Sequence, residues 1–150
     1  MIAIRVNVSE VQLKALKDYV GELPAATKRR LYRIFLATAM DIQGDAKAKV
    51  LTGRHTGTTY RRRGITHRAS APGEYPANDT GTFASSIHYD GNESAMKVTV
   101  GSTVLYGLFL EEGTKRAGQV HMEARPWLKP SLEASRSQLQ ARLNNWRKDI

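Results

Sequence analysis

The fold is decided by residues 24–51, PAATKRRLYRIFLATAMDIQGDAKAKVL, the longest periodic stretch of the chain. Pro24 suits the first turn of a helix, because proline lacks the backbone N–H that this turn leaves unbonded. Apolar and small side chains then recur at steps of three and four residues, which places them on one helix face. They are Leu31, Ile34, Phe35, Thr38, Ile42 and Ala46. The stretch therefore predicts a long helix that buries this face.

A strand and a short helix are expected before the long helix. Over residues 2–8, IAIRVNV, large apolar side chains occupy every second position, which is the period of a strand with one buried face. Ser9 and Gln12 have the spacing of a capping box. A helix should therefore begin near residue 10 and end at about residues 21–23.

The second half of the chain predicts a hairpin and two more helices. Alternating apolar residues at 87–89 and 96–100 flank a turn at 90–92. Residues 104–112 predict a short helix ended by Gly113, and residues 115–123 predict one more short strand. From Pro126 onward, apolar side chains return at helical spacing. This order indicates an α+β fold, with an antiparallel sheet packed against the long helix and the C-terminal helix.

Composition is consistent with one domain over residues 1–150. The chain is 41% hydrophobic and 25% charged, close to the averages of globular proteins. It has no cysteine, which excludes disulfides, thiolate metal sites and cysteine nucleophiles. We recognise no secretory signal and no membrane-spanning run, so we expect no contact with a membrane.

Residues 52–81 lack hydrophobic periodicity and are expected to form an extended basic arm or loop. Five arginines and no acidic residue lie within residues 54–68, and guanidinium groups match the geometry of phosphates and carboxylates. A loop of this length in a small domain is usually functional. The residues expected to bind a partner or DNA are Arg54, Tyr60, Arg61, Arg62, Arg63 and Arg68.

The net charge of the chain also favours an acidic partner. The 23 Lys and Arg residues outnumber the 14 Asp and Glu residues and give a formal charge of +9, which attracts polyanions or acidic protein surfaces. No recognition helix or zinc-finger motif accompanies the arginines, so a contact with DNA would be to its backbone. A small basic nucleic-acid-binding protein is therefore one hypothesis for the function.

No group of residues predicts catalysis. The four histidines lack the spacing of a helical metal pair, and residues 53–59, GRHTGTT, lack the lysine of a phosphate-binding loop. Glu111 and Glu112 are neighbours on a predicted helix and point in different directions. We therefore expect no enzymatic activity, no metal and no cofactor.

Three further stretches resemble one family when they are taken in order. They are residues 70–87, SAPGEYPANDTGTFASSI, residues 100–114, VGSTVLYGLFLEEGT, and residues 124–132, ARPWLKPSL. Together they are similar to the neck or tail-completion proteins of long-tailed double-stranded DNA phages and prophages, which are also described as minor tail or head-tail connector proteins. The resemblance covers residues 31–134, including the long helix and the basic arm. The positions that match the family pattern are Pro72, Gly73, Asp79, Thr80, Gly81, Tyr106, Glu111, Gly113, Thr114, Arg125 and Pro126.

The resemblance implies a structural protein of the virion at the head-tail junction, present in the host cytoplasm before assembly. It implies a ring, hexameric when assembled, with other neck, connector and tail-tube proteins as partners, possible contact with packaged double-stranded DNA, and no cofactor. We expect Glu111 and Arg125 to pair at a subunit interface. For Trp127 both a core position and an interface position are open. The expected interface residues are Tyr106, Glu111, Gly113, Thr114, Arg125, Pro126 and Trp127.

Overall fold

The computed structural model describes residues 10–149 and confirms the α+β class. The strand expected over residues 2–8 lies outside this range. Five helices are described: α1 (Glu10–Glu22), α2 (Ala25–Thr52), α3 (Thr82–Ser86), α4 (Tyr106–Glu112) and α5 (Leu128–Lys148). The described strands are β1 (Thr59–Arg62), β2 (Ile65–Arg68), β3 (Ile87–Asn92), β4 (Lys97–Ser102), β5 (Thr114–Arg116) and β6 (Gln119–Met122). The expected bounds of α1, α2 and α4 are confirmed to within two residues.

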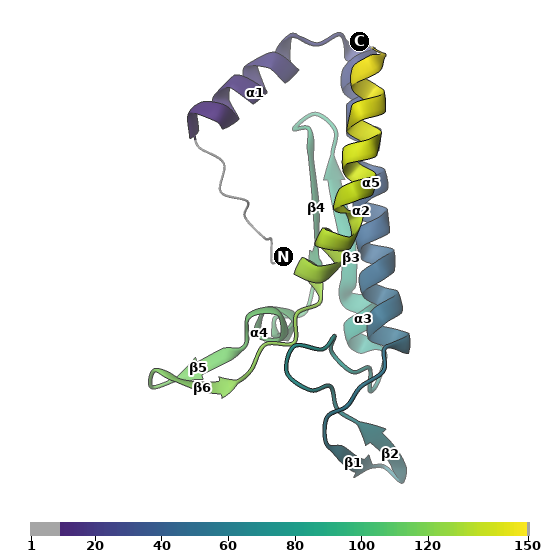
Figure 1. Ribbon diagram of the computed structural model, residues 1–150, viewed down its shortest axis with the longest axis vertical. Helices are drawn as coiled ribbons and strands as arrows, with labels where there is room; N and C mark the ends of the chain where they lie inside the picture. Colours follow the sequence, from purple (N-terminus) through teal and green to yellow (C-terminus); the bar gives the residue numbers. More distant parts are fainter. Residues whose placement is uncertain (1–9, 150) are drawn as a thin grey trace.

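Helices α2 and α5 form the spine of the molecule and run side by side in opposite directions (Figure 1). The start of α2 meets the end of α5, where Arg30 donates to Asp149 at 2.5 Å. Further along, Arg142 of α5 bonds both Thr38, at 3.2 Å, and Asp41, at 2.6 Å, on α2. The helix pair is therefore fixed in register by polar contacts along its length.

The core lies at the other end of α2, where α3, β3 and the start of α5 meet it. Its buried side chains come from α2 (Ile42, Ala46, Val50), from residues 83–87 (Phe83, Ala84, Ile87) and from the start of α5 (Trp127, Leu128). The Trp127 ring is fully buried and packs edge-to-face against the Phe83 ring, with 5.3 Å between the ring centroids. Of the six residues predicted on the α2 stripe, Ile42 and Ala46 are in this core, and Leu31 and Thr38 are buried as well, which accounts for the helical period of the sequence.

Within residues 10–149, the strands form three separate two-stranded antiparallel ribbons rather than one sheet. Of these three ribbons, β3–β4 is the one that packs on α2. Its turn falls at residues 93–96, because the Asn92 side chain accepts from the backbone N–H of Ala95 at 2.9 Å. The turn predicted at residues 90–92 is therefore wrong by three residues. Gly91 lies inside β3, where a Cβ atom would collide with the hydroxyl of Tyr32 on α2.

The other two ribbons are hairpins that the sequence analysis did not predict as such. The arm contains β1–β2, and residues 114–122 form the hairpin β5–β6 instead of one strand. Both have two-residue turns with positive φ at both positions: 51° and 83° at Arg63 and Gly64, and 50° and 80° at Ala117 and Gly118. This geometry matches the twist of paired strands. Both hairpins project from the end of the molecule opposite to the C-terminus (Figure 1).

Candidate partner-binding surfaces

The hairpin β1–β2, residues 59–68, is the centre of the predicted arm, and we call it the basic hairpin. All four residues of β1 are exposed, and so are Arg63 at the turn and Arg68 of β2. Tyr60 pairs with His67 across the strands, and their rings stack with 5.7 Å between the centroids. The backbone pairing of β1 with β2 thus holds the hairpin in shape while most of its side chains are exposed to solvent.

The two faces of the basic hairpin differ because side chains alternate along a strand. Arg62 and His67 share one face and both contact Asp79, His67 at 3.3 Å. Arg61 and Arg68 share the other face. Among residues 10–149, no ion pair involves Arg54, Arg61, Arg63 or Arg68. Of the expected binding residues, Arg62 therefore ties the hairpin to the end of the arm at Asp79. The other four arginines have exposed charges that a partner could contact.

Glu74 holds the base of the arm. Its carboxylate accepts from the hydroxyl of Thr56 at 2.5 Å, from the backbone N–H of Thr56 at 3.1 Å, and from that of Ala71 at 2.8 Å. The Thr56 hydroxyl, followed by the two backbone amides, lowers the pKa of Glu74 to about 2. The arm is therefore a shaped loop whose two ends are tied by one ionised side chain.

A second group of expected residues lies where α4, the arm and α5 meet, and we call these contacts the α5 junction. The Glu111 carboxylate accepts from the backbone N–H groups of Trp127, Leu128 and Lys129 at 2.7 to 3.0 Å. These amides begin α5 and have no partner within the helix. A carboxylate also suits the positive end of the helix dipole. Glu111 is thus a helix cap supplied from 16 residues upstream.

Arg125 belongs to the same junction. Its guanidinium donates to the backbone carbonyls of Ser70, at 3.0 Å, and Glu123, at 3.1 Å, and its backbone N–H donates to the Leu110 carbonyl at 2.7 Å. The ion pair predicted between Glu111 and Arg125 is not among those formed by residues 10–149. Each side chain bonds backbone groups instead, so together they join three segments of one chain.

Trp127 completes the α5 junction from inside the core. Its indole N–H donates to the Gly107 carbonyl at 2.9 Å, and the side chain has no exposed surface. Pro126, beside it, is half-buried, and α5 begins two residues later than that proline. These positions agree with the core interpretation of Trp127, because direct contact with another subunit would need exposed atoms.

The remaining expected interface residues lie on or next to α4. Tyr106 is 42% exposed, and Leu105 and Phe109, which the sequence analysis did not select, are 71% and 41% exposed. Phe109 is four residues from Leu105 and three from Tyr106, so the three side chains are neighbours at the start of α4. The available signal in the sequence was Gly107, the one small residue among these large apolar ones. In the structure Gly107 is the buried residue of α4 and lies on the opposite face. We call these three residues the α4 face.

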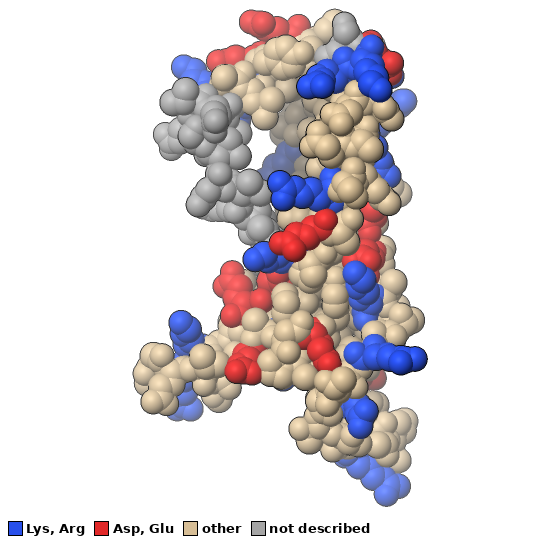
Figure 2. All heavy atoms as spheres, in the orientation of Figure 1, with Lys and Arg blue, Asp and Glu red and all other residues tan. Residues whose placement is uncertain are grey.

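Gly113 and Thr114 connect α4 to the hairpin β5–β6, which sequence analysis also overlooked. Gly113 has φ +73° and ψ −177°, and a Cβ atom there would lie 2.6 Å from the Met122 carbonyl oxygen. Lys115, Arg116 and Val120 of the hairpin are exposed. Basic side chains therefore lie on both projecting hairpins (Figure 2). The dipeptide Ala117–Gly118 was the available signal for this turn.

No cluster of three metal-ligating side chains occurs in the described part of the chain. Within residues 10–149, no helix has the length and apolar character needed to cross a bilayer. The surfaces described above offer exposed charge, apolar side chains and strand edges, which are means of binding a macromolecule.

Comparison with known proteins identifies one family. Residues 14–113, two thirds of the chain, match the family model described as "Bacteriophage HK97-gp10, putative tail-component". No curated protein matches the chain significantly. No solved structure does so either. The matched residues include α2, the whole arm, the β3–β4 ribbon and α4.

Proposed function

Because the chain belongs to the HK97-gp10-like family of phage tail components, we propose that it is a tail-completion or neck protein that forms a ring at the head-tail junction. Membership makes it a structural component of the virion, with other tail proteins as partners, and the family is not one of enzymes. The ring, hexameric when assembled, and its place between tail and head connector are the proposal. The chain would fold in the host cytoplasm and then join the particle.

The observation that carries this proposal is the polarity of the molecule. Both hairpins and α4 lie toward one end, away from the meeting point of α1, the start of α2 and the end of α5 (Figure 1). A ring subunit needs lateral contacts to its neighbours and an axial surface for the next ring. The α4 face is exposed and apolar, which suits a lateral contact. The basic hairpin suits an axial contact, because Arg62 and His67 tie it to Asp79 while Arg63 at its turn is exposed.

The lateral contact is tested by the mass of the purified chain. We expect a closed ring in light scattering and in negative-stain images, and Phe109→Asp in the α4 face should shift the mass to that of a monomer. Met40→Asp is the matched control, because Met40 is 52% exposed on α2, away from α4. A Phe109→Asp variant that still forms rings would exclude the α4 face. A wild-type chain that stays monomeric even with its neighbouring tail proteins present would exclude the ring itself.

The axial contact is tested by removing the three arginines of the basic hairpin that have no ion partner in the described part of the chain. We expect Arg61→Ala, Arg63→Ala and Arg68→Ala together to leave the fold intact, because these side chains are exposed, and to block joining of tails to filled heads. The matched control removes the same charge from exposed helix positions, with Arg33→Ala, Arg136→Ala and Arg147→Ala. Normal infectious-particle yield from the hairpin variant would exclude this role.

A second function, binding of the DNA backbone by the arm, is favoured by Arg54 and by Arg61, Arg63 and Arg68 of the basic hairpin, which have no ion partner among residues 10–149. If all four neutralise phosphates, the logarithm of the duplex affinity should fall with the logarithm of salt concentration with a slope of about −3 to −4. The hairpin variant should flatten that slope while the helix control keeps it. A shallow slope in the wild-type chain would contradict DNA binding and leave an acidic protein surface as the partner.

A further inference from the structure

A ring requires two different contact surfaces on each subunit. In a ring of more than two copies, the surface that one subunit offers is received by a different surface on the next. The α4 face is apolar, and acidic side chains lie beside it. Glu112 follows Phe109 by three residues and is exposed, and Glu123 is exposed close to Gly113 at the end of the helix. The receiving surface should therefore be open, apolar and basic.

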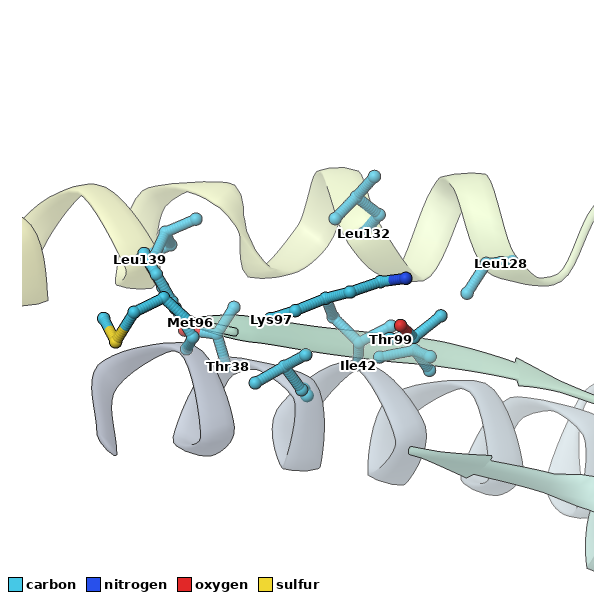
Figure 3. Close-up of a pocket in the computed structure, with 12 residues that line it drawn as sticks. Thr38, Ile42, Met96, Lys97, Thr99, Leu128, Leu132 and Leu139 are labelled. Atoms are coloured by element: carbon cyan, nitrogen blue, oxygen red, sulfur yellow. The ribbon is translucent and has the colours of Figure 1, made fainter. Parts of the chain in front are cut away.

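Two connected cavities lie along the spine of the molecule. The smaller is a groove of about 500 Å³ that is lined by apolar residues of α2, β4 and α5 (Figure 3). The larger, of about 950 Å³, shares Phe35 and Met96 with the groove. It lies between α1, the first half of α2, the end of α5 and the β3–β4 turn, and we call it the α1 cleft. Figure 2 shows the molecule hollowed between α1 and the spine.

The walls of the α1 cleft are apolar and incompletely covered. Leu16 and Tyr19 of α1 line the cleft, yet they are 57% and 51% exposed. Leu31 of α2, with Leu143 and Trp146 of α5, lies on the other walls. Within residues 10–149, helix α1 thus stands away from the helices that its apolar side chains would be expected to contact. Large apolar surface that is open in this way marks a binding site for another protein surface.

The charges on the α1 cleft are mainly basic. Lys17, Lys28 and Arg29 line it, against the single acidic residue Glu93. None of the three basic residues forms an ion pair within the described part of the chain, and Lys17 and Arg29 are exposed. The smaller groove has Lys97 as its one charged lining residue. The α1 cleft is therefore the better complement to an apolar surface with acidic neighbours.

We propose that the α1 cleft of one subunit receives the α4 face of the next, an inference that rests on the proposed ring. Leu105 and Phe109 enter the cleft and pack against its apolar walls, while Glu112 meets Lys17 and Arg29. Packing supplies most of the affinity, and the charges fix the orientation of the contact. Since α4 and α1 lie toward opposite ends of the spine (Figure 1), each subunit contacts the next in a head-to-tail manner around the ring.

Cysteine crosslinking tests this contact directly, because the wild-type chain has no cysteine. One chain carries Leu105→Cys and a second carries Leu16→Cys, both at exposed positions that tolerate substitution. We expect the mixed chains to form rings of wild-type mass and to be joined in pairs by a short bismaleimide. Met40→Cys replaces Leu16→Cys in the matched control, since Met40 is exposed on α2 and does not line the cleft. The control pair should remain unjoined.

Ring mass and crosslinking separate the two levels of the proposal. Rings without a crosslink between positions 105 and 16, or with equal crosslinking to position 40, would overturn the assignment to the α1 cleft and leave the ring standing. Crosslinks formed by the Leu105→Cys chain alone would show a contact between two α4 faces and would overturn it as well. Chains that form no ring even with neighbouring tail proteins present would exclude the ring and this contact together.

Charge reversal provides a second test that needs no crosslinker. We expect Glu112→Lys and Arg29→Glu each to raise the concentration needed for half-assembly by about threefold or more, and the two together to restore it. Glu133→Lys is the control, because Glu133 is exposed on α5 and lines neither cavity. It should not restore the assembly of the Arg29→Glu chain. Restoration by Glu133→Lys, or no restoration by Glu112→Lys, would overturn the proposal.

Discussion

The basic hairpin and the α5 junction place arginines and carboxylates in opposite circumstances. In the hairpin, the charges of Arg61 and Arg63 are directed to solvent without an ion partner among residues 10–149. At the junction, Glu111 and Arg125 bond backbone groups of three segments, around a fully buried tryptophan. Charge that is committed to backbone amides fixes the shape of the chain, and charge that is left exposed is available to a partner.

Substitutions in the two regions should therefore change different properties of the protein. Variants at the α5 junction should lower the free energy of unfolding, and any defect in assembly would follow from that loss. Variants at the tip of the basic hairpin should impair assembly and leave the free energy of unfolding unchanged. The contrast depends on burial, because the free-energy cost of a substitution follows the contacts that are lost.

Trp127→Ala should produce the largest loss of stability. Removing a fully buried aromatic side chain leaves a cavity and costs about 3–5 kcal/mol in the free energy of unfolding, and here the indole hydrogen bond to Gly107 is lost as well. Tyr60→Ala in the basic hairpin is the comparison, because Tyr60 is 41% exposed; its effect should stay within about 0.5 kcal/mol. Urea denaturation measures both. Similar effects would erase the distinction between the two regions.

Gly113→Ala should come second. The φ and ψ angles of Gly113 lie in a region that is essentially restricted to glycine, and another residue placed there costs about 1–3 kcal/mol in backbone strain. The new methyl group would also collide with the Met122 carbonyl. We expect a loss of about 2–3 kcal/mol. Gly118→Ala in the hairpin turn is the matched control. Its φ is +80° but it has open space around it, so it should cost about 1 kcal/mol. Thermal denaturation of the two variants would contradict this order if Gly118→Ala were the more harmful.

Glu111→Ala should cost about 1–2 kcal/mol, the range of a lost helix cap. The reason is that three backbone amides at the start of α5 lose their acceptor. Glu112→Ala is the control, because its side chain is exposed on the next position of α4 and should be near neutral. Chemical denaturation distinguishes them. If Glu111→Ala is as stable as the wild-type chain while assembly fails, Glu111 acts at a subunit contact rather than as a cap.

The sequence predicted the helices better than the ribbons, and the physical reason lies in the range of the signals. The period of residues 24–51 is local, so α2 could be placed to within a residue. The two projecting hairpins are exposed on both faces, so no hydrophobic alternation marks them. Their signals were the turn dipeptides Arg63–Gly64 and Ala117–Gly118, which require positive φ. These were present in the sequence but were not used.

The residues of the candidate surfaces also differ in how far the sequence could predict them. The arginines of the arm were identified from composition alone, because exposed charge needs no knowledge of the fold. The roles of Glu111 and Glu74 depend on contacts with residues up to 18 positions away, which no spacing rule specifies. Resemblance to a family selected Glu111 and Arg125 as a pair. Only the structure shows that both bond the backbone.

The smallest expected effect concerns Glu74, which lies between the two regions and ties the base of the arm. Its pKa of about 2 in the folded chain lies below the ordinary 4.5. The ionised form is therefore favoured by folding, so this anchoring is complete above about pH 4.5 and is lost as the pH falls toward 2. The amide signals of Thr56 and Ala71 should titrate with a midpoint near 2 in NMR spectra, while Gly64 at the hairpin tip stays unchanged. Glu74→Gln should remove this titration and show a loosened arm already at neutral pH. A midpoint near 4.5 would mean that the base of the arm is as open as its tip, and the hairpin would then have to be ordered by its partner rather than presented to it.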